Sequence, residues 1–79
     1  MTDIRQTNED YKVIDAICRT YECNTEQAFA ICNDIANRLH DYEQHNEHGS
    51  INALMQHIGL TANYRFAIYS LAERYLLEK

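Results

Sequence analysis

The chain has 79 residues, a formal net charge of −5 and 46% hydrophobic residues. This length allows one small domain, and the acidity argues against sequence-independent binding to nucleic acid or anionic membranes, because both require a positive field. No apolar run approaches the roughly 20 residues that cross a bilayer. We therefore expect a cytoplasmic protein, with a flexible N-terminus of residues 1–7 and a single folded domain of residues 8–79.

The cysteines do not indicate a disulfide framework, because their number is odd and no secretory leader precedes them. Free cysteine is most often a small apolar core residue of a protein in a reducing compartment. We expect this role for Cys18, Cys23 and Cys32.

Helices are indicated along the whole chain, because proline is absent and the only two glycines are Gly49 and Gly59. The first predicted helix covers residues 8–22. Thr7 is placed to cap it, with Asp10 three residues further on. Its apolar residues then recur on one face at helical spacing.

The second predicted helix covers residues 25–46 and has the clearest periodic pattern. Asn24 or Thr25 can cap it, and Gln27 is placed to complete a capping box. The pattern fades toward Gly49, which we expect to end the segment in a left-handed conformation. One continuous apolar stripe follows the helix, formed by Ala28, Ile31, Cys32, Ile35, Ala36, Leu39 and Tyr42.

Two further helices are predicted in the last third of the chain. Ser50 can cap a short helix over residues 51–58, which Gly59 then ends. Thr61 can cap the last helix, over residues 62–77, whose apolar residues cover about half of its circumference. The fold class is therefore all-α, a compact bundle of about four helices.

A helix-turn-helix arrangement is present in residues 50–77. Gly59 in the turn and Leu60 after it match DNA-binding versions of this motif. Such a protein would bind DNA as a dimer, but nucleic-acid binding is disfavoured because few basic side chains begin the last helix. The residues available for DNA are Thr61, Asn63 and Arg65.

A metal site is weighed at the end of the second predicted helix. Asp41, His45 and His48 recur at i, i+4 and i+7, a spacing that could present three ligands on one face. The pattern fades in this stretch and no cysteine ligand is well placed. We expect no metal and no other cofactor.

Catalysis has little support in the sequence. Cys23 precedes a helix N-terminus, where a thiolate is favoured, and His40 or His57 could pair with it. No nucleophile motif or glycine-rich phosphate loop accompanies these residues. We therefore expect that the protein is not an enzyme.

Two surfaces remain as candidates for binding another protein. Residues 1–50 hold ten acidic and four basic residues, which predicts an acidic face for a basic partner. That face consists of Asp15, Glu22, Glu26, Asp34, Asp41, Glu43 and Glu47. The last helix has more aromatic area than a thin core needs, which favours an interface or a homodimer. Its apolar contact residues are Phe66, Tyr69 and Leu77.

The function predicted from these features is that of a small acidic regulatory or inhibitory protein that binds another protein. A sharper version is a phage or mobile-element inhibitor that offers carboxylates, in place of phosphates, to a nucleic-acid-binding host protein. In size and charge the chain resembles phage-encoded inhibitors such as anti-CRISPR proteins, although this likeness covers no motif. The alternative is the dimeric helix-turn-helix transcriptional regulator described above.

Overall fold

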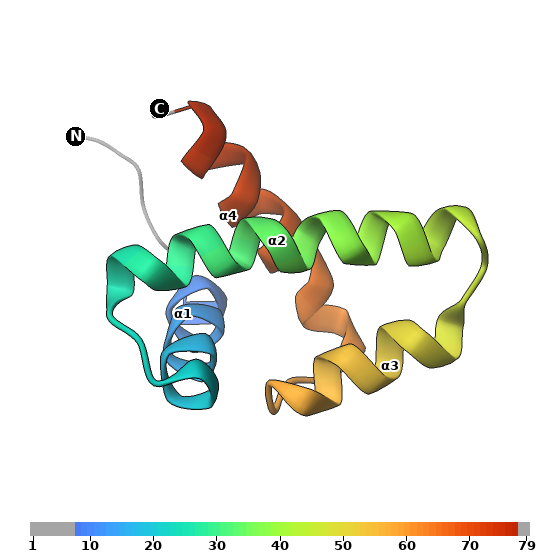
Figure 1. Cartoon of the computed structure of the whole chain (residues 1–79), viewed down its shortest axis with the longest axis horizontal. Coiled ribbons are helices and arrows are strands. Elements are labelled where there is room, and N and C mark those ends of the chain that lie inside the picture. The colour runs from blue at the N-terminus through green and yellow to red at the C-terminus, as the bar shows by residue number, and fades with distance from the viewer. Residues whose placement is uncertain (1–7, 78–79) are drawn as a thin grey trace.

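The computed structural model describes residues 8–77, and within them the chain forms helices and no strand (Figure 1). The predicted all-α fold is confirmed. The α-helices are α1 (Asn8–Tyr21), α2 (Thr25–Gln44), α3 (His48–His57) and α4 (Arg65–Leu77), and a short 3-10 helix, η1 (Ala62–Tyr64), precedes α4. The predicted flexible segment 1–7, with its capping residue Thr7, lies outside the described residues.

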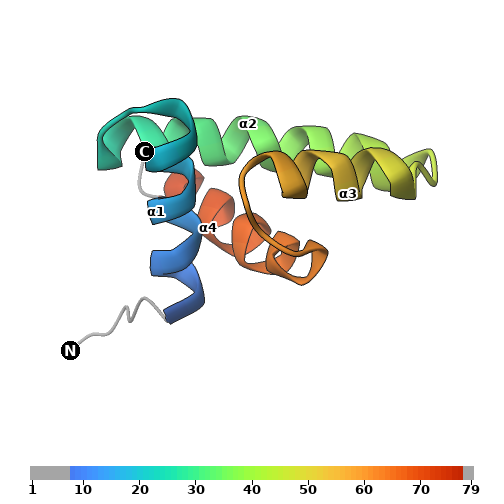
Figure 2. The same cartoon turned by 90° about the horizontal axis from the view of Figure 1, so that it is seen from below.

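The longest helix, α2, organises the fold. Helix α4 crosses it and packs most extensively against it, while α1 lies beside its N-terminal half and α3 beside its C-terminal half (Figures 1 and 2). All three helices contact the apolar stripe of α2, which explains why one long amphipathic helix suffices for a single core. The largest fully buried side chains are Val13, Ile17, Cys32, Leu39, Met55, Ile58, Ile68 and Leu71.

The start of α2 is fixed as the sequence predicts. The Asn24 side chain accepts a hydrogen bond of 2.8 Å from the Gln27 backbone, and the Gln27 side chain accepts one of 3.1 Å from the Asn24 backbone. This reciprocal capping box satisfies two backbone donors that the helix itself leaves unpaired. Asn24, rather than Thr25, is therefore the cap.

Three helices end in the same backbone motif, with one residue in the left-handed region. These residues are Glu22 (φ 52°), Asn46 (φ 55°) and Gly59 (φ 79°). After each, the next N–H bonds back to a carbonyl five residues earlier, as in Leu60 N–H to Met55 O at 3.0 Å. This is the Schellman arrangement. The predicted end at Gly59 is confirmed.

The predicted stop at Gly49 is wrong, because Asn46 takes the left-handed conformation instead. Asparagine tolerates this region better than most residues, so α2 ends at Gln44 rather than residue 46. The Glu47 N–H then bonds to the Tyr42 carbonyl at 2.8 Å. The chain has already turned by this point, and α3 begins at His48 rather than residue 51.

Helices α1 and α4 are joined by an ion pair that sequence spacing does not reveal. The Arg74 guanidinium lies 2.7 Å from the Asp10 carboxylate, and Asp10 is only 4% exposed. Asp10 thus serves the tertiary structure, whereas the sequence suggested a role near the Thr7 cap. In the described part of the chain, no helix has both the length and the apolar character that crossing a membrane requires.

Candidate functional site

Glu43, in the last turn of α2, joins that helix to the beginning of α4. Its carboxylate accepts a hydrogen bond of 2.6 Å from the Tyr69 hydroxyl and one of 3.1 Å from Arg65 Nε. Arg65 also donates to the Ala62 carbonyl at 2.8 Å. The Tyr69 hydrogen bond, with help from Arg65, lowers the pKa of Glu43, so the carboxylate is ionised at neutral pH and holds both α4 side chains.

Phe66 is 61% exposed, although its ring has two intramolecular supports. The Arg65 guanidinium carbon lies 4.4 Å from the ring centroid, a cation–π contact, and Tyr69 meets the ring edge-on with centroids 6.4 Å apart. Tyr69 in turn stacks on His40 at 4.3 Å between centroids. We call His40, Glu43, Arg65, Phe66 and Tyr69 the Phe66 cluster.

Two hollows adjoin the Phe66 cluster, one where α2 and α3 meet η1 and the start of α4, and the other between α2 and α4. One, of about 410 Å³, is lined in part by Glu43 and Arg65. The other, of about 310 Å³, is lined in part by His40 and Tyr69. Phe66 lines neither hollow, but it contacts Arg65 and Tyr69, which each line one of them. An exposed ring with such neighbours gives a surface on which a partner's side chains can pack.

Four of the predicted acidic residues are exposed on or next to α2. Asp34 and Asp41 are seven residues apart, two helical turns, and so share the face of α2 that points away from the core. Glu26 lies in the first turn of the same helix, and Glu22 lies just before it. Asp34 and Asp41 are the closest of these in sequence to the Phe66 cluster, since Asp41 follows His40 directly.

The other three predicted acidic residues are engaged elsewhere. Asp15 forms an exposed ion pair with Arg19 on α1. Glu43 is bound within the Phe66 cluster, and the Glu47 carboxylate accepts a hydrogen bond of 3.1 Å from the Ser50 hydroxyl. The seven predicted carboxylates therefore occupy several places on the molecule rather than one continuous face.

The predicted apolar contact is only partly described. Phe66 and Tyr69 are in contact within the Phe66 cluster, whereas the side chain of Leu77 lies outside the described part. The surplus of aromatic residues on α4 is smaller than the sequence suggested, because Tyr75 stacks on Phe29 with centroids 6.3 Å apart.

The residues considered for DNA binding begin the segment of η1 and α4. Thr61 and Asn63 are exposed, but Thr61 makes no side-chain cap bond. The Arg65 side chain is 27% exposed, and its guanidinium is already held by Glu43, by the Ala62 carbonyl and by Phe66. A contact between Arg65 and DNA would require these bonds to break.

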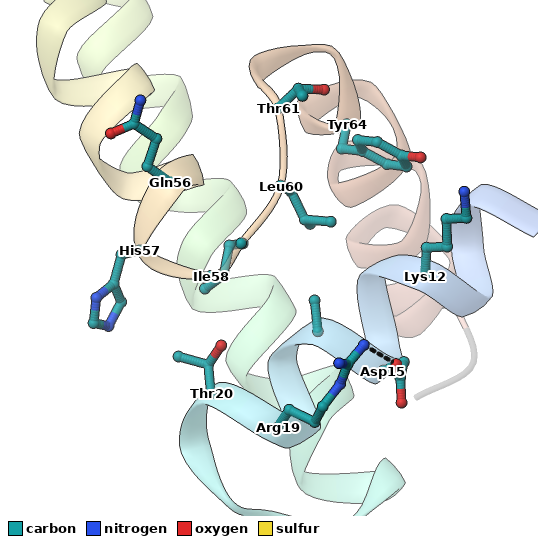
Figure 3. A pocket seen from close by; sticks show the side chains of 12 residues that line it. Lys12, Asp15, Arg19, Thr20, Gln56, His57, Ile58, Leu60, Thr61 and Tyr64 are labelled. Carbon is teal, nitrogen blue, oxygen red and sulfur yellow. Dashed lines mark hydrogen bonds and ion pairs between the residues drawn. The ribbon is translucent and has the colours of Figure 1, made fainter.

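A groove of about 570 Å³ lies between α1 and the turn that joins α3 to η1 (Figure 3). Lys12 and Arg19 come from α1, and Tyr64 comes from η1 (Figure 3). The floor includes the buried Ile58 and the half-buried Leu60. Asp15 is the one acidic residue of the lining and is paired with Arg19, so the groove is locally basic and could hold an anionic group with an apolar body.

The structure separates the residues weighed as metal ligands. Asp41 and His45 remain an i, i+4 pair, with His45 Nδ1 3.6 Å from the Asp41 carboxylate and 2.9 Å from its carbonyl. His48 belongs to the next helix, beyond the left-handed Asn46. Within residues 8–77, no three His, Cys, Asp or Glu side chains are grouped to hold a metal ion.

The histidines considered as partners for Cys23 make other contacts. His40 stacks on Tyr69 in the Phe66 cluster, and His57 packs edge-on against Tyr21 with centroids 6.1 Å apart. These ring contacts support a structural role for both imidazoles. Neither of these two contacts joins a histidine to Cys23.

Comparison of the chain with protein-family models, with curated proteins and with solved structures gives no match. The function is therefore inferred from the geometry of the surface. Sequence reasoning singled out Phe66 and Tyr69 for an apolar surface and Glu43 for a separate acidic face. It missed His40 as a support and Arg65 as an internal partner of Glu43, because these contacts span 22 to 29 residues and leave no periodic signal.

Proposed function

We propose that the chain is a small regulatory or inhibitory protein that binds a basic protein partner. The Phe66 cluster would provide the apolar contact, and Asp34 and Asp41 would provide the charge. The observation that carries this proposal is the Phe66 ring, which is 61% exposed yet held by Arg65 and Tyr69.

A preorganised aromatic ring is suited to binding because little side-chain entropy remains to be lost when a partner covers it. Aromatic and arginine side chains are also the residues on which binding energy most often concentrates. Tyr11 is equally exposed, at 60%, but no ring or cation contact of its side chain is found among the described residues. Phe66 is therefore the better candidate for an anchor.

The carboxylates of α2 would act mainly on the rate of association. Asp34 and Asp41 lie on the outward face of α2, next to the helix edge that carries His40. A negative face attracts a basic partner during diffusional encounter and repels acidic ones. A protein that normally binds nucleic acid has such a basic surface, which supports the sharper proposal of an inhibitor of a nucleic-acid-binding protein.

The DNA-binding alternative has less support. The chain carries −5 overall, and the one arginine near the start of the proposed recognition helix is held by Glu43. Binding to duplex DNA depends on cationic groups that neutralise phosphates. A duplex titration at low salt tests this alternative directly, because a regulator would bind and the proposed inhibitor would not.

The proposal is tested by capturing the partner with the tagged chain and then comparing two charge reversals against it. Asp41 and Asp15 are matched, since their side chains are 64% and 61% exposed and each is paired with a residue four positions on. We expect Asp41→Lys to slow association about tenfold at low salt. Asp15→Lys should change it less than about twofold, because surface charges away from an interface act weakly. Equal effects of the two reversals would refute a role for the α2 face.

A further inference from the structure

The end of α1 brings two of the three cysteines together. The Cys23 N–H donates a hydrogen bond of 3.2 Å to the Cys18 carbonyl, closing the Schellman turn around the left-handed Glu22. In this motif the side chains of the two residues that share the outer hydrogen bond are frequently in contact. This backbone hydrogen bond places Cys18 and Cys23 side by side at the end of α1.

The third cysteine differs in its surroundings. Cys32 is fully buried in the core, and its thiol donates to the Ile68 carbonyl at 3.6 Å. Burial, followed by the charge of Asp10, raises the pKa of Cys32 to about 12, so this thiol stays protonated and inert. Cys18 and Cys23 are each half-buried at the edge of the core and reachable from solvent.

We propose that Cys18 and Cys23 form a reversible dithiol–disulfide site that is oxidised by small disulfides of the glutathione class. The disulfide would link the last turns of α1 to the segment that connects α1 with α2 (Figure 1). It does not depend on the proposed protein-binding function, because neither cysteine belongs to the Phe66 cluster or to the outward face of α2. The local turn sets the pair in place before any oxidant arrives.

Oxidation proceeds in two exchange steps. The Cys23 thiolate attacks one sulfur of glutathione disulfide, forming a mixed disulfide at Cys23 and releasing one glutathione thiolate. The Cys18 thiolate then attacks the Cys23 sulfur, forming the Cys18–Cys23 bond and releasing the second glutathione thiolate. The two protein thiols lose two electrons and two protons, and glutathione disulfide takes up both to give two molecules of glutathione.

The order of the steps follows from the surroundings of Cys18. Burial, then the neighbouring Cys23 thiol and the Asp15 carboxylate, raise the pKa of Cys18. A raised pKa leaves less thiolate for the first, bimolecular attack. In the second step the mixed disulfide lies beside Cys18 in the same turn, so proximity compensates for the smaller thiolate fraction.

The experiment equilibrates the whole chain with mixtures of reduced and oxidised glutathione, in buffer and again in concentrated urea. Remaining thiols are blocked with an alkylating agent, and intact mass with peptide mapping then locates the bonds. We expect one disulfide, between Cys18 and Cys23, while Cys32 is alkylated after unfolding. Because the folded turn preorganises the pair, the equilibrium constant for closure in buffer should exceed that in urea by about tenfold or more.

Two single variants separate the steps. Cys18→Ser should accumulate the mixed disulfide at Cys23, because the one remaining thiol, Cys32, is buried in the core and does not displace glutathione. Cys23→Ser should be modified more slowly than Cys18→Ser, since only the weaker nucleophile remains exposed. Helical circular dichroism shows that each variant is folded under the conditions used.

Three results would overturn the proposal. One is a wild-type chain that stops at the mixed disulfide, and another is closure that is no stronger in buffer than in urea. The third is a disulfide that involves Cys32 or joins two chains. Each of these would mean that the turn does not preorganise the Cys18–Cys23 pair.

Discussion

At the scale of single residues, two ion pairs of α1 lie in different environments and should contribute differently to the free energy of unfolding. Asp15 and Arg19 are exposed, with side chains 61% and 77% accessible, so solvent screens their attraction. Asp10 is 4% exposed as a residue and meets Arg74 at 2.7 Å across the α1–α4 interface. Removing the Arg74 guanidinium takes away a charged group that offsets the desolvation of this buried carboxylate.

We therefore predict that Arg74→Leu destabilises the fold by about 3 kcal/mol, whereas the matched change Arg19→Leu costs less than about 0.5 kcal/mol. Urea unfolding followed by circular dichroism measures both. Combining Arg74→Leu with Asp10→Asn should cost less than the sum of the single changes, because the two side chains interact. If the two changes in unfolding free energy were additive, Asp10 and Arg74 would have no measurable interaction energy.

At the scale of helices, the ends of α1, α2 and α3 show how one backbone motif is met by three different residues. The motif requires positive φ, which glycine adopts without steric cost and other residues adopt with strain. Gly59 meets the requirement directly, and Asn46 is the next best tolerated. Glu22, at φ 52°, is the least suited of the three.

Replacing Glu22 with glycine should consequently stabilise the protein by about 0.5–1 kcal/mol. This net effect arises because the relief of backbone strain exceeds the cost of the larger conformational entropy that glycine gives the unfolded chain. Gly59→Ala should destabilise it by about 1 kcal/mol. A side chain at position 59 would meet no atom within 4 Å, so the cost comes from the backbone alone. Thermal unfolding compares these variants with Glu22→Gln, which controls for loss of charge. A lower thermal unfolding midpoint for Glu22→Gly than for Glu22→Gln would contradict the prediction that the backbone is strained at Glu22.

The C-terminal end of α2 should respond to pH through His45. The backbone carbonyl of Asp41, and then its carboxylate, raise the pKa of His45 above its usual value of 6.5. A raised pKa in the folded state adds stability that is fully present below pH 6.5 and is lost as pH rises through the folded pKa. Amide hydrogen exchange in the last turn of α2 should therefore be slower at pH 5.5 than at pH 8, after correction for intrinsic rates. His45→Gln should reduce that difference, and an unchanged difference would exclude His45 as its source.

At the scale of the whole molecule, the elements were predictable from sequence because their signals are local. The stripe of α2, its Asn24–Gln27 capping box and the end of α3 at Gly59 all follow from spacing and from residue type. The stop at Asn46 was missed because glycine at position 49 is the stronger statistical signal. Asn46 stands three residues earlier, just after the apolar stripe has ended at Tyr42, and it takes the left-handed conformation before Gly49 is reached.

The candidate site was less predictable because its contacts are distant in sequence. Glu43 meets Arg65 and Tyr69 only after α4 has crossed α2, and Asp10 meets Arg74 across 64 residues. Composition placed Phe66 among the exposed contact residues, but only the fold shows the cation and the ring that hold it. The expected homodimer stays a prediction, and sedimentation equilibrium of the chain measures it.

The most direct test of the binding proposal compares the affinities of two variants for the captured partner. Phe66 and Tyr11 are 61% and 60% exposed, so truncating either ring removes similar exposed area, but among the described residues only Phe66 has ring and cation contacts that hold it. We expect Phe66→Ala to weaken binding by about 2 kcal/mol, roughly 30-fold in Kd by calorimetry, and Tyr11→Ala to change it less than about twofold. Equal affinities of the Phe66→Ala and wild-type chains would contradict the claim that this face binds the partner.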